Sequence, residues 1–167
     1  MIDTLPIYPM GIKLSQTWRE VVTHFEIIAR HNVRLFVELG VHHGGLAALM
    51  LAYQDYNSAF RYLGVEIDRR LVDSRVARPD AILYGDCLNS ITMRAVKTFI
   101  DVTKGPACVF CDNGNKPAEL KAYAPLLRPG DFISVHDYGT EITDSDFDCV
   151  AEFESLDGYG LPVFRKQ

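Results

Sequence analysis

Short apolar runs alternate with segments of helical spacing along almost the whole chain, and this rhythm constrains the fold more than any other feature. The apolar runs cover residues 34–40, 60–68, 80–86, 105–112, 129–137 and 160–167. The segments with helical spacing cover residues 15–31, 44–56, 69–77, 87–101, 116–127 and 144–154. Strands that alternate with helices in this way form parallel βαβ units. We therefore predict an α/β fold with a doubly wound, Rossmann-like, mostly parallel sheet.

The domain organisation follows from length and local composition. A chain of 167 residues is expected to form one domain. Residues 1–14 carry Pro6, Pro9 and Gly11 and predict an irregular N-terminal arm, whereas residues 15–167 predict the domain itself. Ser15 is a candidate N-cap for the first helix. The short final segment predicts that the C-terminal pair of strands is shortened.

Charge and composition exclude several classes of partner. The formal net charge is −5 and no run of Lys and Arg occurs, so we expect no nucleic-acid surface. We expect no membrane association and no signal peptide, because the apolar runs are too short and the N-terminus lacks the required pattern. Cys108 and Cys111 form a CxxC inside an apolar run, where buried, reduced thiols are favoured over zinc, and a cytoplasmic location is expected.

Polar residues follow each of the first five apolar runs. In doubly wound sheets, ligands bind at the carboxyl ends of the strands, near the point where the strand order reverses. A set of five such ends favours a binding site over five unrelated solvated strand ends. The candidate residues, in chain order, are Glu38, Gly40, His42, Gly44, Gly45, Glu66, Ile67, Asp86, Cys87, Asp112, Lys116, His136 and Asp137.

The turn after the first run indicates what class of ligand binds. Gly40, Gly44 and Gly45 form a G-x-x-x-G-G pattern, with His42 where a dinucleotide fingerprint has its second glycine. Glu66 ends the second run, where a carboxylate can accept hydrogen bonds from ribose hydroxyls. Asp86 follows the third run and can receive an adenine amino group. The pattern predicts a nucleoside ligand that does not need a phosphate-binding loop.

These motifs resemble those of the class I S-adenosylmethionine-dependent methyltransferases. "VELGVHHGG" is similar to their first motif, "GVEID" to the second and "YGD" to the third. The segment "VFCDNGNKPAELKAYAPLLRPGDFISVHDYG" resembles the small-molecule branch, and the nearest groups are the methyltransferase-24-like and cephalosporin hydroxylase-like proteins. The resemblance covers approximately residues 10–140.

The resemblance implies specific contacts with the cofactor. Glu38 and the turn from Gly40 to Gly45 would hold the methionine part of S-adenosylmethionine. Glu66 would bind the ribose, with Ile67 beside it, and Asp86 would bind the adenine, with Cys87 beside it. Asp112 would also face the cofactor.

The resemblance and the residues together raise the question of a metal. Metal-dependent relatives hold Mg²⁺ with an Asp after the fourth strand and an acidic pair after the fifth, and Asp112 and Asp137 match two of these positions. His136 departs from the acidic pair. Oxygen ligands that converge from adjacent strands suit Mg²⁺, but Asp112 and His136 could instead bond to each other or to the acceptor. Lys116 or His136 is the candidate proton acceptor.

Three functions remain open at this stage. The first is a methyltransferase, O-directed, on a small-molecule acceptor. The second is a protein that binds S-adenosylmethionine or another nucleoside without catalysis, because little chain follows the fifth run to build an acceptor pocket. The third is an oxidoreductase, against which His42 in the glycine turn counts. The arm and first helix could pack on a second copy of the chain, and His24 and His31 are expected at the surface or end of that helix.

Overall fold

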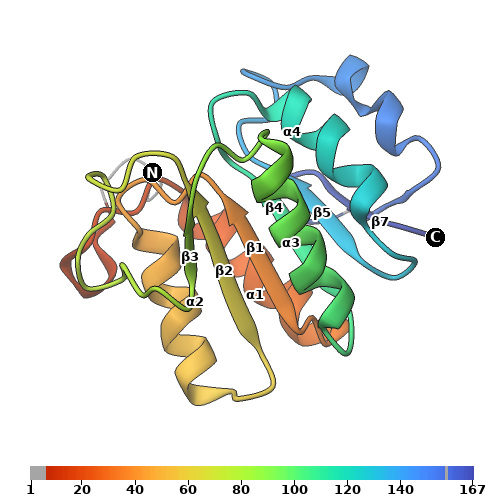
Figure 1. The fold of residues 1–167 in the computed structure, drawn as a ribbon. Helices are drawn as coiled ribbons and strands as arrows, with labels where there is room; N and C mark the ends of the chain where they lie inside the picture. The colour runs from red at the N-terminus through yellow and green to blue at the C-terminus, as the bar shows by residue number, and fades with distance from the viewer. Residues whose placement is uncertain (1–6, 157) are drawn as a thin grey trace.

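A seven-stranded sheet forms the centre of the computed structural model, which describes residues 7–156 and 158–167 (Figure 1). The strand order is β3-β2-β1-β4-β5-β7-β6. The strands are β1 (Leu35–Leu39), β2 (Arg61–Glu66), β3 (Ile82–Tyr84), β4 (Ala107–Cys111), β5 (Phe132–Val135), β6 (Glu154–Ser155) and β7 (Val163–Arg165). The strands β1 to β5 pair in parallel, whereas β7 pairs antiparallel with β5 and β6. The α/β class, the mostly parallel sheet and the shortened C-terminal pair are therefore confirmed.

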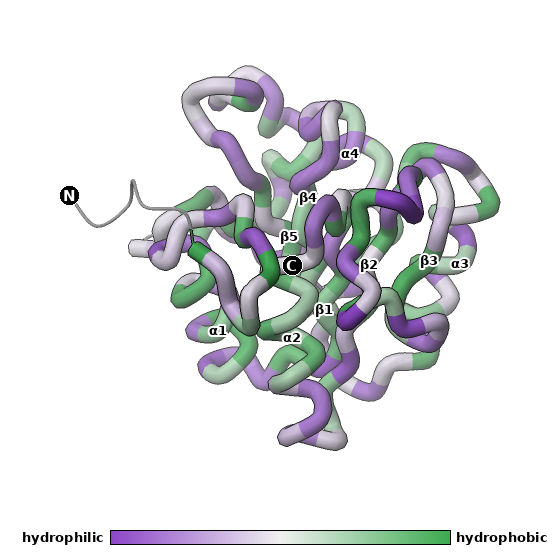
Figure 2. Tube along the Cα trace, turned by 90° about the vertical axis from the view of Figure 1, so that its left-hand side faces the viewer, coloured by the Kyte–Doolittle hydropathy of each residue, from purple (hydrophilic) through white to green (hydrophobic). Residues whose placement is uncertain are grey.

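Helices cover both faces of the sheet, as the apolar strands predict. They are α1 (Trp18–His31), α2 (Gly45–Tyr56), α3 (Ser90–Val102) and α4 (Lys116–Tyr123). Successive strand residues point to opposite faces. Phe36 and Phe110 pack in the core under α1 and α2, and Val37 and Val109 pack in the core under α3 and α4. Figure 2 shows hydrophobic stretches along the central strands and mainly hydrophilic stretches in the connecting loops.

The predicted helix at residues 69–77 is wrong, because this segment forms a series of turns between β2 and β3. The carboxylate of Asp68 accepts a bond from the Arg70 N–H at 3.0 Å, and that of Asp73 accepts one from the Arg75 N–H at 2.9 Å. Such short-range side-chain bonds offer the backbone an alternative to the helical ladder.

Several helix boundaries differ from the predicted ones: α3 begins at Ser90 instead of residue 87, and α4 ends at Tyr123, before a short three-ten turn. Helix α1 begins at Trp18, and its N-cap is Thr17 instead of Ser15, because Thr17 and Glu20 form a reciprocal capping box. The segment predicted as a helix over residues 144–154 is a three-ten helix at Asp144–Val150, after which the chain extends into β6.

The described part of the N-terminal arm is irregular, with a three-ten turn at Pro9–Gly11. It also contributes Ile12 and Leu14 to the core under α1 and α2. The first six residues of the predicted arm lie outside the described residues.

Three further features bear on the predictions. His24 is fully buried between Phe36 and Phe110, so its predicted surface position is wrong, and burial lowers its pKa to about 3. The cysteines are free, and Cys108 and Cys111 are buried in β4 as predicted. Within the described ranges, no helix has the length and apolar character that crossing a bilayer requires.

Candidate active site

The glycine turn after β1 is shaped by close approach of the chain to itself. Gly40 has a φ of +95°, and a Cβ at this position would lie 2.7 Å from the carbonyl oxygen of Asp112. A Cβ on Gly45 would lie 2.5 Å from the Cα of Leu14. Both positions therefore require glycine, whether or not a ligand also approaches them. The approach of Gly40 brings the ends of β1 and β4 together.

Glu66, at the end of β2, fastens the same turn. Its carboxylate accepts hydrogen bonds from the backbone N–H of His42 at 2.8 Å and of Asp68 at 2.9 Å. The backbone of His42 lies in the left-handed region, with a φ of +50°, which the bond to Glu66 supports. Two oxygen lone pairs of the carboxylate remain for ribose hydroxyls.

Glu38 lies fully buried in β1 beneath the turn. Burial raises the pKa of its carboxyl well above the usual range, although the hydrogen bond that the Tyr62 hydroxyl donates works in the opposite direction. Its Oε1 has no hydrogen-bond partner among the described residues. Glu38 is therefore held by the core and carries a polar atom that a ligand group could satisfy.

The residues predicted beside the ribose and the adenine separate into exposed and buried positions. Ile67 is 64% exposed, and Asp86 is exposed and accepts a bond from the Leu88 N–H at 2.9 Å. Cys87 is buried, and its Sγ accepts a hydrogen bond from the side-chain amide of Asn113 at 3.2 Å. Burial raises the pKa of the Cys87 thiol to about 11, so the thiol is neutral and structural.

The structure brings Asp112, His136 and Asp137 together at the ends of β4 and β5. The Nδ1 of His136 lies 2.8 Å from the Oδ1 of Asp112 and 3.1 Å from the Oδ2 of Asp137. One ligand atom from each of the three residues lies within 4.8 Å of the other two. Nδ1 is buried and makes no hydrogen bond of acceptable geometry with either carboxylate. With the imidazole neutral, this nitrogen and the two carboxylate oxygens fit the ligand set of a divalent cation.

The other face of His136 is held by a residue that the sequence analysis missed. Its Nε2 lies 3.1 Å from the Oε1 of Glu20, the same residue that caps α1 with Thr17. Burial lowers the pKa of His136, but the carboxylates of Asp112 and Glu20 outweigh burial and raise it to about 10. A carboxylate behind the imidazole also fixes the ring, as in many metal sites. The Thr-x-x-Glu capping box was a readable sequence signal for Glu20, but not for its contact with His136.

Gln16 is a second residue that the sequence analysis missed. It is buried, and its side-chain amide donates a hydrogen bond to the Oδ2 of Asp112. Its neighbour Ser15 places its hydroxyl 3.3 Å from the Nδ1 of His42. The segment that leads into α1 therefore touches both the glycine turn and the acidic site. No pattern in the sequence marks these contacts.

Lys116 lies beside this cluster and is buried at the start of α4. Its Nζ contacts Glu141 at 2.7 Å and Asp137 at 3.2 Å, and it bonds to the carbonyl of Asn113 at 3.0 Å. Burial lowers the pKa of Lys116, but the two carboxylates outweigh it and raise the pKa above the usual range. Lys116 is therefore a charged ion-pair partner and a poor proton acceptor.

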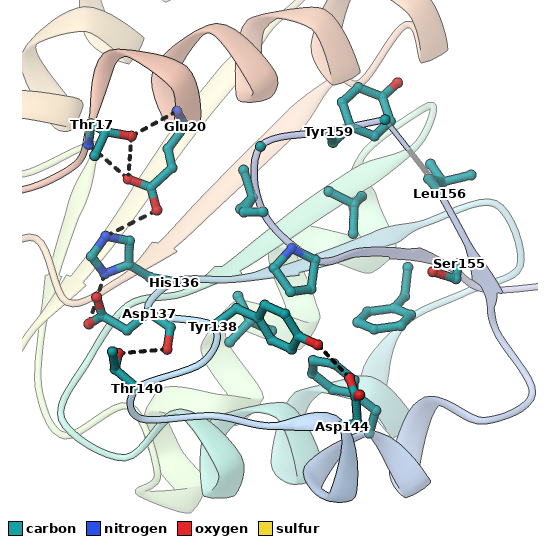
Figure 3. Close-up of a pocket in the computed structure, with 18 residues that line it drawn as sticks. Thr17, Glu20, His136, Asp137, Tyr138, Thr140, Asp144, Ser155, Leu156 and Tyr159 are labelled. Carbon is teal, nitrogen blue, oxygen red and sulfur yellow. Dashed lines mark hydrogen bonds and ion pairs between the residues drawn. The ribbon is translucent and has the colours of Figure 1, made fainter. Parts of the chain in front are cut away.

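A cavity of about 630 Å³ opens next to His136 and Asp137 (Figure 3). Its other walls come from the start of α1, with Glu20, and from the chain after β5, including Tyr138, Phe147 and Phe164. A volume of this size is typical of small-molecule sites. The expectation that little chain remains to build an acceptor pocket is therefore wrong, because the C-terminal loops fold back around the end of β5.

Comparisons with known proteins agree with this arrangement. A structure of apo CmcI superposes with a TM-score of 0.73 at 15% identity, over 96% of this chain and 76% of that one. A structure of CmcI with Mg and SAM gives a TM-score of 0.63 at 18% identity, over 78% of this chain and 57% of that one. A structure described as a caffeoyl-CoA O-methyltransferase from Staphylococcus aureus gives a TM-score of 0.62 at 11% identity, over 93% of this chain and 86% of that one. At these identities, the likeness shows the fold.

Sequence comparison is more specific than the structural likeness. Among curated proteins, none matches the chain. A family model described as rhamnosyl O-methyltransferase/CmcI matches residues 6–155. Because this match spans most of the chain, including the glycine turn, the acidic cluster and the start of the cavity wall, the protein belongs to the rhamnosyl O-methyltransferase/CmcI family.

Proposed function

We propose that this protein is an S-adenosylmethionine-dependent methyltransferase that methylates a hydroxyl group of a small molecule, with Mg²⁺ at the acidic cluster. The observation that carries the proposal is the position of Asp112, His136 and Asp137. Asp112 adjoins the glycine turn through Gly40, and His136 and Asp137 line the cavity. The family supports O-methylation, and the CmcI structure with Mg and SAM supports both cofactors.

In this proposal the turn and the end of β2 bind the cofactor. Glu38, Gly40, His42, Gly44 and Gly45 surround the methionine part, and Asp112 faces it from β4. Glu66 binds the ribose with the lone pairs that His42 and Asp68 leave free. Ile67 offers an exposed apolar surface to the adenine, and Asp86 accepts from the adenine amino group above the buried Cys87.

The residues around the cavity then position the acceptor. Asp112, Asp137 and the Nδ1 of His136 would hold Mg²⁺, which supplies a positive charge that lowers the pKa of an acceptor hydroxyl. Glu20 orients His136 from behind, and Lys116 holds Asp137. Methyl transfer is an in-line displacement, so its rate depends on how well these groups align the acceptor oxygen with the methyl carbon. When no cation is bound, the raised pKa values keep both His136 and Lys116 protonated, so neither predicted proton acceptor is available in that state.

Calorimetry with S-adenosylmethionine, in Mg²⁺ and again in a chelator, tests the proposal first. We expect binding in both conditions, followed by methyl transfer to hydroxylated acceptors that depends on Mg²⁺. Binding without transfer to any acceptor would favour a non-catalytic S-adenosylmethionine-binding protein. Absence of binding in both conditions would overturn the assigned cofactor site.

A further inference from the structure

Part of the cavity wall is aromatic. The rings of Tyr138 and Phe147 are stacked, with centroids 5.9 Å apart and an interplanar angle of 16°. Phe147 in turn meets Phe164 edge to face at 4.8 Å. All three side chains line the cavity, and Tyr138 is half exposed. A layered wall of this kind offers flat apolar surface and suits a ligand with a ring.

Among the described residues that line the cavity, Asp144 is the one acid outside the cluster around His136. Glu20, Asp137 and Asp144 line it, and none of its described lining residues is Lys or Arg. Lys116 lies nearby, but its ammonium group is already bound by Glu141 and Asp137. Away from the cation that we propose at Asp137 and His136, a carboxylate or phosphate group of an acceptor would find no counter-charge among the described lining residues and would lose hydration beside Asp144.

Asp144 is the acid that would face the end of the acceptor farthest from His136. Figure 3 shows it at the end of Tyr138 that points away from His136, where the Tyr138 hydroxyl donates to its Oδ1 at 2.7 Å. Asp144 is exposed and forms no ion pair with the described residues. Its carboxylate can therefore accept a cationic group while Tyr138 holds it in place.

We propose that the acceptor is a hydroxylated aromatic compound whose remaining body is uncharged or carries an amine, and that Asp144 sets the preference for the amine. This inference rests on the proposed role of the cavity as the acceptor site. It disfavours acceptors that carry a carboxylate or phosphate at the end that faces Asp144. The aromatic wall selects the ring, and the carboxylate of Asp144 selects against an anion at the end of the acceptor that it faces.

Three phenols of similar length test the charge preference: tyramine, 4-propylphenol and 3-(4-hydroxyphenyl)propanoate. Their affinities are measured by calorimetry or ligand-observed NMR with S-adenosylhomocysteine present, so that no turnover is required. We expect tyramine to bind about threefold more tightly than 4-propylphenol, and the propanoate about threefold more weakly, as for partly exposed charge pairs. Tighter binding of the propanoate, or no binding of any probe, would overturn the proposal.

The variant Asp144→Asn removes the charge alone, because its amide oxygen can still accept the hydrogen bond from the Tyr138 hydroxyl. We expect it to remove the advantage of tyramine and to leave 4-propylphenol unchanged. Asp148→Asn is the matched control, since Asp148 is an exposed acid on the same three-ten helix and does not line the cavity. An unchanged tyramine preference in Asp144→Asn would remove Asp144 from the proposal.

The two proposals fail in different ways. If S-adenosylmethionine does not bind but the three phenols keep the expected order, the assigned function fails and the ligand preference of the cavity stands. If methyl transfer occurs and the order of the phenols is reversed, the function stands and the assigned acceptor class fails.

Discussion

The two halves of the candidate site are built by different means. At the ends of β1 and β2, backbone groups dominate: Glu66 binds the N–H of His42 and of Asp68, and Gly40 and Gly45 admit neighbouring backbone. At the ends of β4 and β5, side chains hold side chains, as in the contacts of Asp112 with Gln16 and of His136 with Glu20. The first half is a shaped backbone surface, and the second is a charged network anchored to the start of α1.

The difference implies different sensitivities to substitution. Loss of one member of the charged network leaves its partners buried and unpaired, which is costly. Loss of a backbone-shaping residue moves the turn and so acts first on stability and cofactor affinity. The predictions below test this contrast.

The largest effect is expected for Asp112→Ala. This change removes a proposed cation ligand and leaves Gln16 and His136 without their carboxylate. Methyl transfer should fall by about 100-fold or more, and Mg²⁺ binding should weaken in parallel. Rates with radiolabelled S-adenosylmethionine and Mg²⁺ calorimetry measure both effects, with Asp148→Ala as the control. A rate within a fewfold of wild type would show that the network is structural.

A smaller effect on binding is expected for Glu66→Gln. The amide keeps one acceptor oxygen but turns an NH₂ group toward a backbone N–H, either that of His42 or that of Asp68. We expect S-adenosylmethionine affinity to fall about tenfold, because one buried bond is lost at the turn. Calorimetry measures the affinity. Glu26→Gln serves as the control, because Glu26 is a half-exposed acid on α1. Equal affinities in the two variants would contradict the assignment of Glu66 to the cofactor.

The contrast between the halves also explains what the sequence could predict. The strand rhythm predicted the sheet and its two helical layers, because apolar periodicity is a local property that burial enforces. The position of Asp112, His136 and Asp137 at strand ends followed from the same rule. The contacts of Glu20 with His136 and of Gln16 with Asp112 could not be predicted, since each pair is far apart in the sequence. The prediction of a helix at residues 69–77 is wrong for a local reason, because Asp68 and Asp73 stabilise turns that compete with a helix.

Gly45→Ala tests the backbone-shaped half through stability alone. Gly45 is the first residue of α2, where Ala would ordinarily stabilise the helix. Its new Cβ would lie 2.5 Å from the Cα of Leu14 and from the carbonyl oxygen of Lys13. We therefore expect a loss of about 1–3 kcal/mol in the free energy of unfolding. Gly114→Ala is the control, because nothing lies within 4 Å of its added Cβ. A stabilised Gly45→Ala would mean that the arm does not pack on the turn.

The smallest effect concerns the dependence of stability on pH, and it comes from Glu38 beneath the turn. Burial raises the pKa of this carboxyl in the folded protein, so the folded state favours the protonated form. Its contribution to stability is therefore full below the unfolded pKa, near 4.5, and is lost as the pH rises toward the raised folded value. Glu38→Gln keeps an acceptor for the Tyr62 hydroxyl and cannot ionise. Urea unfolding of both proteins from pH 5 to pH 8 should show the variant gaining stability relative to wild type as the pH rises. A constant difference across this range would mean that the Glu38 carboxyl is ionised in the folded protein as it is in the unfolded one, and the backbone-shaped half would then contribute no pH dependence through this residue.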